Sequence, residues 1–308
     1  EISECLVGSE MCIRDSFDGF HRGHQAVLQQ AKAEAEKRGA SLAVLTYDHH
    51  PALVYKKIAP HDKRYITLLN HKLALLEDFG VQKVLLVNYS YQFQSQTPSE
   101  FVEHFLKRFN PVAVVAGFDH TYGGSPDDNM ENLPKFVNGA FDVLTVPALT
   151  QDNQKVSSSR IRRALDASDV ETVNQLLGRP FQTQGVIVHG EERGRLLGYP
   201  TANVEHSEYQ WLPAIGIYVV TVEIAGQKYL GMASIGRNVT FGDDGPMTVE
   251  INLIDFNQNI YGEVVRVNWL AHGRGEIKFQ TADELVTQLG KDEAATRQYL
   301  KNHPDILH

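Results

Sequence analysis

The feature that most constrains the fold of this 308-residue chain is a change in its hydrophobic pattern close to Gly178-Arg179-Pro180. Before that point, short apolar runs alternate with longer stretches rich in Ala, Gln, Glu and Lys, which favour helix. After it, short alternating segments follow one another, separated by turns that contain glycine. Because the chain is longer than the usual single domain, we expect two domains of different classes.

The first part predicts an α/β domain with a doubly wound parallel sheet. Helices are expected at 25–38, 67–79, 98–109 and 130–138, with Gly39 and Gly80 as C-terminal stops and Thr97 as an N-cap. Buried strands are expected at 41–46, 84–87, 112–116 and 141–146. Strands that alternate with helices place their ligands along the carboxyl edge of the sheet. Residues 1–16 should supply the first strand, but their one short apolar stretch, Cys5-Leu6-Val7, predicts a poor one, and whether this segment is native stays open.

The second part predicts a small antiparallel β-barrel followed by helix. Two helices are expected first, at 159–165 and 170–177. Strands are expected at 185–189, 216–224, 228–235, 248–256 and 263–270. Helices at 283–289 and 294–302 are expected to follow the strands. We place the boundary near residue 182, which gives domains 1–182 and 183–308.

Composition narrows the function. The net charge of −9 argues against a general nucleic-acid-binding protein, which would present a basic face. The sequence has no apolar run of the ~20 residues that span a membrane, and its start lacks a secretory pattern. The only cysteines, Cys5 and Cys12, predict neither a disulfide framework nor a zinc site, so the reducing cytoplasm is the expected compartment.

A first motif, Phe17-Asp18-Gly19-Phe20-His21-Arg22-Gly23-His24, stands where the first strand-to-helix turn is expected. Its glycines let the backbone approach a ligand, and a helix N-terminus adds positive potential for phosphate oxygens. Far along the chain, Ser157-Ser158-Ser159-Arg160-Ile161-Arg162 offers hydroxyls and forked guanidinium donors at another helix start. A glycine-rich turn and a capped basic helix are the plainer interpretations, but together the motifs favour nucleotide binding.

The pair resembles the H-x-G-H and I-S-S-T-x-x-R signatures of the nucleotidylyltransferase superfamily, with Ser159 in place of Thr. The resemblance implies a Rossmann-like domain for in-line attack on the α-phosphate of ATP, catalysed by positioning and electrostatics. His21 and His24 would stabilise the transferring phosphate, and Ser159 and Arg162 would hold the leaving pyrophosphate. The remaining phosphate-binding positions implied are Phe17, Asp18, Gly19, Gly23 and Ser158.

Two further segments resemble the adenylyltransferase domain of the bacterial bifunctional riboflavin kinase/FMN adenylyltransferase family. Thr46–Pro51 resembles T-F-x-P-H-P and Gly117–Gly123 resembles G-x-D-F-x-F-G, which implies flavin-binding roles for His50 and Asp119. The chain departs from the family at Asp15-Ser16, where Gly and then Asn or Thr is expected. An acid beside the phosphates is expected to weaken ATP binding, and the basic residues expected after Gly123 are missing.

A second motif, Gly194–Asn203, begins with glycines that can wrap phosphates. The Thr201 hydroxyl and the Asn203 amide supply oxygen ligands suited to Mg²⁺. Glu250 stands between Val249 and Ile251, so it points to the opposite face of its strand. A turn-rich loop and a solvent-facing strand acid are the plainer interpretations.

This second motif closely resembles the G-R-x-L-G-x-P-T-A-N motif of riboflavin kinases, in which a Glu acts as base for the 5′-hydroxyl of riboflavin. The resemblance implies that Glu250 is this base and that Arg274, in Arg274–Phe279, touches the flavin. It implies Mg²⁺ at Thr201 and Asn203, and phosphate binding by Gly190, Gly194, Arg195, Gly198 and Asn203.

The resemblance covers residues 17 to about 300 and predicts a bifunctional enzyme. The second domain would phosphorylate riboflavin with Mg-ATP to give FMN, and the first would transfer AMP from ATP to FMN, giving FAD and pyrophosphate. A monofunctional riboflavin kinase with a degenerate first domain and a non-catalytic flavin- or nucleotide-binding protein stay open as alternatives. We expect small-molecule partners only, without nucleic acid or membrane; the oligomeric state is open.

Overall fold

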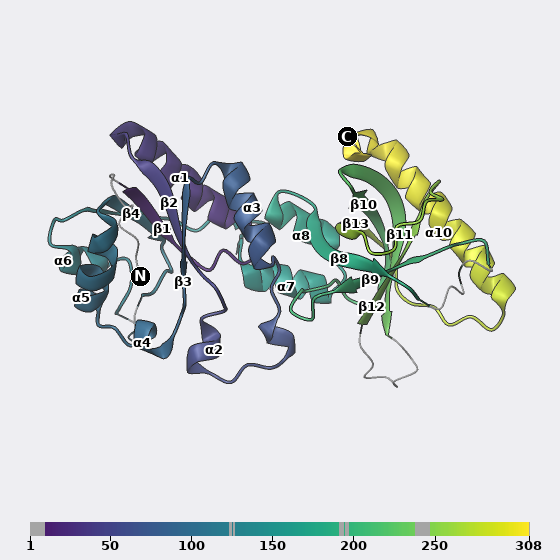
Figure 1. Ribbon diagram of the computed structural model, residues 1–308, viewed down its shortest axis with the longest axis horizontal. Coiled ribbons are helices and arrows are strands. Elements are labelled where there is room, and N and C mark those ends of the chain that lie inside the picture. Colours follow the sequence, from purple (N-terminus) through teal and green to yellow (C-terminus); the bar gives the residue numbers. More distant parts are fainter. Residues whose placement is uncertain are drawn as a thin grey trace. The chain divides into compact units, whose positions relative to one another are not determined.

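The computed structural model describes residues 10–122, 125, 127–190, 194, 197–237 and 247–307 (Figure 1). The chain divides into two compact units, residues 1–158 and 159–308. The sequence places the boundary near residue 182, whereas α7 (Ser158–Asp166) and α8 (Val170–Leu177) group almost wholly with the second unit. In the described residues, no helix is long and apolar enough to cross a membrane.

The first unit is built on a five-stranded parallel sheet in the order β3-β2-β1-β4-β5, which confirms the predicted α/β class. The strands are β1 (Glu10–Arg14), β2 (Ser41–Tyr47), β3 (Lys83–Val87), β4 (Pro111–Gly117) and β5 (Asp142–Val146). The expectation of a poor strand in residues 1–16 is wrong for β1. Pairing with β2 on one side and β4 on the other supplies backbone hydrogen bonds that local composition does not reveal.

Helices cover both faces of this sheet. They are α1 (Arg22–Arg38), α2 (Ala52–Tyr55), η1 (His61–Lys63), α3 (Leu69–Phe79), α4 (Tyr91–Gln94), α5 (Pro98–Glu100), η2 (Phe101–Phe105), η3 (Leu106–Phe109) and α6 (Leu133–Val137). Gly39 and Gly80 end α1 and α3 in the left-handed conformation, and Thr97 caps α5, as the sequence predicts. The single helix expected at 98–109 is instead broken into α5, the π-helical η2 and the 3₁₀-helical η3.

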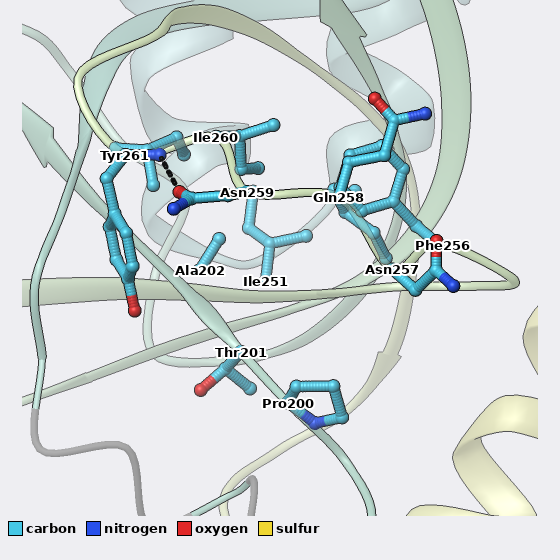
Figure 2. A pocket seen from close by; sticks show the side chains of 12 residues that line it. Pro200, Thr201, Ala202, Ile251, Phe256, Asn257, Gln258, Asn259, Ile260 and Tyr261 are labelled. Carbon is cyan, nitrogen blue, oxygen red and sulfur yellow. Dashed lines mark hydrogen bonds between the residues drawn. The ribbon is translucent and has the colours of Figure 1, made fainter.

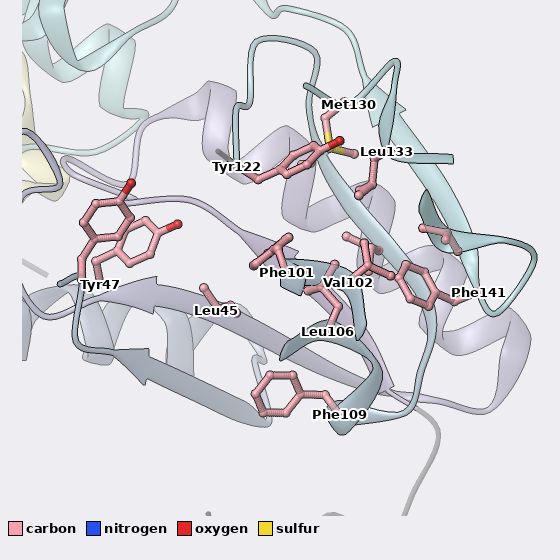
Figure 3. Close-up of a cluster of buried hydrophobic side chains, with 14 residues drawn as sticks. Leu45, Tyr47, Phe101, Val102, Leu106, Phe109, Tyr122, Met130, Leu133 and Phe141 are labelled. Carbon is pink, nitrogen blue, oxygen red and sulfur yellow. The ribbon is translucent and has the colours of Figure 1, made fainter. Parts of the chain in front are cut away.

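The two faces have separate cores because strand residues alternate between them. Leu42 and Val44 of β2 pack with Leu28 and Ala31 of α1, whereas Leu45 and Tyr47 join the opposite cluster. Figure 3 shows that opposite cluster, where Phe101, Val102, Leu106, Phe109, Tyr122, Met130, Leu133 and Phe141 gather. The aromatic packing on this face accompanies the break of the expected helix.

The second unit is a closed six-stranded antiparallel barrel, in the order β10-β11-β12-β9-β8-β13, and this confirms the predicted β class. Its strands are β8 (Phe181–Val188), β9 (Ala202–His206), β10 (Gly216–Ile224), β11 (Gln227–Arg237), β12 (Met247–Leu253) and β13 (Val264–Arg274). The two closing helices expected at 283–289 and 294–302 are one helix, α10 (Ala282–Asn302), followed by η5 (Pro304–Leu307). A small two-stranded ribbon, β6 (Thr150–Gln151) and β7 (Gln154–Lys155), belongs to the first unit and was not predicted.

Candidate active sites

The loop between β1 and α1, residues 15–21, is the centre of the first site, and we call it the phosphate loop. Phe17 and Phe20 adopt positive φ angles of 49° and 43°, and both rings are buried in the core beneath the loop. The Asp18 carboxylate accepts hydrogen bonds from the backbone N–H groups of Ile66 (2.9 Å) and Thr67 (3.2 Å). The carboxylate of Asp18 therefore fixes the loop to the segment that precedes α3.

His21 and His24 come together at the start of α1. Their rings stack with centroids 3.6 Å apart, and the His24 N–H donates to His21 Nδ1 (3.2 Å) as the helix N-cap. Gly23 allows this packing, because a Cβ there would lie 3.1 Å from the His21 ring and 3.3 Å from Val156 O. Burial, helped by the charges of His24 and Lys155 and opposed by Asp15, lowers the pKa of His21 to about 2. His21 is therefore neutral at physiological pH.

Asp15 places a carboxylate against this histidine pair. Its Oδ2 lies 3.3 Å from His24 Nε2, and its side chain is 40% exposed. Burial raises the pKa of Asp15, but the pairing with His24 outweighs it, so the net pKa lies below the ordinary value. At the position where this chain departs from the family pattern, the ionised carboxylate of Asp15 therefore contacts His24, one of the two predicted catalytic histidines.

The other predicted residues of the first site follow neighbouring strands at the same sheet edge. Ser158 donates from Oγ to Asp18 O (2.8 Å), which joins the serine motif to the phosphate loop. The loop after β2 carries His50, whose Nδ1 accepts from the Ala52 N–H (3.1 Å). Asp119, after β4, forms an ion pair with Lys155.

Lys155 is a site residue that the sequence reasoning missed. Its Nζ lies 5.0 Å from the Phe118 ring centroid, and its charge acts on His21. The signal was available, because Lys155 lies only two residues before the serine motif that begins at Ser157. Ser159 and Arg162 lie in α7 within the second unit, where the Arg162 guanidinium stands 5.5 Å from the Trp211 ring centroid. Their approach to the histidines stays a prediction.

In the second site, two of the glycines predicted to bind phosphate pack closely against neighbouring groups, among them the Asn203 amide predicted to bind the metal. A Cβ at Gly190 would lie only 2.0 Å from Asn203 Nδ2, and a Cβ at Gly194 would lie 2.3 Å from Tyr199 O. Gly198 has a positive φ of 82°. At Gly190 and Gly194 only glycine fits without displacing a neighbour, whereas at Gly198 a side chain would have room but would strain the backbone. Arg195 lies outside the described residues.

Strand register brings Thr201, Asn203 and Glu250 together. Glu250 of β12 pairs with Asn203 of β9, and the Thr201 hydroxyl donates to Glu250 Oε2 (3.4 Å). Asn252 Nδ2 donates to Pro200 O (2.8 Å), which holds the chain just before Thr201. A hydroxyl, an amide and a carboxylate thus meet in one place.

Two cavities lie on either side of this meeting point. The first, of about 400 Å³, we call the amide cavity; it is lined by Ile187, Pro200, Thr201, Ala202, Ile251, Leu253 and the segment 256–261. Figure 2 shows the segment from Phe256 to Tyr261 across this cavity from Pro200 and Thr201; the Gln258 amide is directed away from these two residues, and Asn259 Oδ1 accepts a hydrogen bond from the Tyr261 N–H (3.1 Å). The second, of about 300 Å³, we call the apolar cavity; its lining includes Met232, Ile235, Ile277, Phe279, Leu285, Leu289, Thr201 and Glu250.

Arg274 also lines the apolar cavity, where α10 neutralises its charge. Its Nη2 lies 2.7 Å from Asp292 Oδ2, and its Nε donates to the same carboxylate. Only 18% of the Arg274 side chain and 10% of the Asp292 side chain are exposed. Asp292 is a second residue of this cavity that the sequence reasoning missed, and one of four acids in a polar helix gave no signal for it.

Comparison with known proteins identifies the class of this protein as a two-domain, ATP-dependent transferase. Residues 13–160 match the family described as FAD synthetase, and residues 177–300 match the family described as riboflavin kinase. The chain is 41% identical to the "Bifunctional riboflavin kinase/FMN adenylyltransferase" of Listeria monocytogenes, over 94% of this chain and 92% of that protein. It is 38% identical to the Bacillus subtilis protein of the same name, over 93% and 91%.

A solved structure from Streptococcus pneumoniae, titled a macrolide-efflux protein, is 40% identical over 94% of each chain, with a TM-score of 0.87. Matches to two family descriptions in this order, and to full-length relatives, identify the particular family. The chain belongs to the bifunctional riboflavin kinase/FMN adenylyltransferase family.

Proposed function

We propose that the second unit phosphorylates riboflavin with ATP where the two cavities meet. Thr201 lines both cavities, and alternate residues of β12 face opposite ways: Ile251 and Leu253 line the amide cavity, Glu250 and Asn252 the apolar one. Two substrates can therefore approach from opposite sides of one strand. This division of β12 is the observation that carries the proposal.

The linings suggest which substrate occupies each cavity. Both volumes fall within the ~300–1,000 Å³ of small-molecule sites. Met232, Ile277 and Phe279 offer an apolar bed for the isoalloxazine ring, and their cavity contains Glu250, the acid suited to accept the proton of the 5′-hydroxyl. The Asn257 amide and the Asn259 Nδ2 group, whose Oδ1 already accepts from the Tyr261 N–H, can pair with the edge of adenine.

A Mg²⁺ ion fits this site. The Thr201 hydroxyl and the Asn203 carbonyl are the hard oxygen ligands that Mg²⁺ takes when phosphates complete its shell. When bound, the ion would neutralise charge on the transferred phosphate. Gly190 leaves the space that the Asn203 amide needs, and β12 holds Glu250 beside it.

We propose that the first unit transfers AMP from ATP to FMN at the histidine pair. His21 is neutral, and its Nδ1 accepts a hydrogen bond from His24 N–H, so its proton lies on Nε2 and can be donated to a phosphate oxygen. The start of α1 supports negative charge at the same place. Lys155 can release Asp119 and turn to the phosphates or to the flavin phosphate, since this exposed pair is weakly held.

A second candidate, a riboflavin kinase with an inactive first domain, is favoured by Asp15. Its carboxylate lies 3.3 Å from His24 Nε2 and would compete with a phosphate oxygen for that nitrogen. We further propose that both reactions take place in the cytoplasm and involve only small-molecule partners.

The test incubates the purified chain with riboflavin, ATP and Mg²⁺ and separates the flavins by chromatography. We expect FMN and, more slowly, FAD. FMN alone would favour the second candidate, whereas neither product would overturn the enzymatic proposal and leave a flavin-binding protein.

A further inference from the structure

Lys72, on the first turn of α3, points beneath the phosphate loop. Its ammonium donates to Ser16 O (3.1 Å), Thr46 Oγ1 (3.1 Å) and Tyr47 O (3.3 Å). These acceptors lie at the carboxyl ends of β1 and β2, and Thr46 Oγ1 itself donates to Ser16 O (3.3 Å). All three donors of the ammonium are satisfied, and the residue is 7% exposed.

The segment that precedes α3 also contacts the phosphate loop at a second point, Asp18. The N–H groups of Ile66 and Thr67 donate to the Asp18 carboxylate, and a Cβ at Gly19 would meet the Ile66 side chain at 3.3 Å. Residues 66–72 therefore hold the loop on both sides of Phe17. Ser16 immediately precedes Phe17 and Asp18 in the phosphate loop.

A buried ammonium is a costly way to make three neutral hydrogen bonds. Within the described part of the chain, no carboxylate lies within 4.0 Å of Lys72 Nζ. Burial lowers its pKa, while the more distant charges of Asp18, Asp15 and Asp48 raise it. A buried ammonium that has no carboxylate in direct contact, placed under a phosphate loop, is suited to a ligand that brings its own negative charge.

We propose that Lys72 is a positioning residue for adenylyl transfer: it fixes Ser16 and its charge draws the triphosphate onto the phosphate loop. The proposal rests on the proposed function of the first unit. All three donors of Lys72 are used within the protein, so it acts through the loop and through its field.

The experiment compares Lys72→Met, Lys72→Arg and the control Lys32→Met in the full-length chain. Lys32 is a half-buried lysine of the same unit that also donates to a backbone carbonyl, Phe79 O (3.2 Å), at the other end of α3. Initial rates of FAD formation from FMN are measured against ATP concentration, and FMN formation from riboflavin is measured in the same preparations. Thermal unfolding checks that each variant folds.

We expect Lys72→Met to lower kcat/KM for FAD formation by about 10- to 100-fold, since misplacement of a site loop has effects of this size. Lys32→Met, and FMN formation in every variant, should stay within about twofold of the parent, because these lie outside the affected loop. Lys72→Arg should restore part of the loss, because it keeps the charge.

A pH profile separates this role from a purely structural one. As the pH rises through the lowered pKa of Lys72, the ammonium loses its charge and FAD formation should decline. The charged groups that act on the ammonium are the carboxylates of Asp15, Asp18 and Asp48. In Lys72→Arg the decline should vanish, because guanidinium stays charged.

A Lys72→Met chain that makes FAD at the parental rate, or a Lys72→Arg chain with an unchanged alkaline decline, would overturn the proposal alone. If Lys72→Met unfolds, the Lys72→Arg profile decides. A parent that makes FMN but no FAD would overturn the adenylyl-transfer function itself, and this proposal with it.

Discussion

The two sites hold their polar groups in different ways. In the first, the functional side chains stand on loops at the ends of parallel strands, and contacts such as Asp18 with Ile66 and Thr67 tie each loop to distant parts of the unit. In the second, antiparallel register places Asn203 opposite Glu250 and sends neighbouring residues of β12 into different cavities. A loop site therefore depends on its anchors, whereas a barrel site depends on pairing that most substitutions leave intact.

The largest expected effect separates the two sites completely. Glu250→Gln should lower kcat for FMN formation by ~10²- to 10⁴-fold, the usual contribution of a positioned general base. FAD formation from supplied FMN should not change. Both rates are followed by flavin chromatography, with the exposed neighbour Glu205→Gln as the matched control. A Glu250→Gln chain with parental FMN formation would remove Glu250 as the base.

The reciprocal change is His24→Ala. We expect FAD formation to fall by ~10²- to 10³-fold, as when a donor to a developing oxyanion is lost, while FMN formation persists. The exposed His104→Ala serves as the control in the same assay. Equal losses in both activities would show that the sites are not independent.

Crowding the barrel site tests whether register and packing suffice to fix it. Gly190→Ala introduces a Cβ 2.0 Å from Asn203 Nδ2, so the amide must turn away, and we expect about a tenfold loss of FMN formation. Gly275→Ala, whose Cβ would meet nothing within 4 Å, is the control. The KM for Mg-ATP should account for most of the difference. An unchanged KM would argue against a role for Asn203 near the metal.

The smallest expected effect concerns Asp15. Removing its charge with Asp15→Asn should lower the KM for ATP in FAD formation by roughly fivefold, about the strength of one partly screened charge contact. Because the pKa of Asp15 is already depressed, mild acid should not reproduce this gain. Asp142→Asn, an exposed acid paired with Arg38 in the same unit, is the control. A rise in KM would mean instead that Asp15 supports His24.

The sequence by itself determined the two-domain order, the doubly wound sheet, the barrel and both phosphate motifs. It could do so because hydrophobic period, helix stops such as Gly39 and glycine-rich turns are local signals. It did not reveal β1, the break after α5 or the continuity of α10. Those depend on neighbouring strands and on aromatic packing from distant segments.

Only the tertiary structure decided what surrounds each motif. Four contacts join residues that share no local sequence pattern. They are those of Asp15 with His24, Lys72 with Ser16, Lys155 with Asp119 and Asp292 with Arg274. The alternation along β12 was predictable from the sequence, but the tertiary structure decided that its two faces line two different cavities. These four contacts join residues that are far apart in the sequence, and hydrophobic periodicity carries no information about such pairs. The sequence therefore predicted the chemistry of the motifs but not the neighbouring charges that modify it.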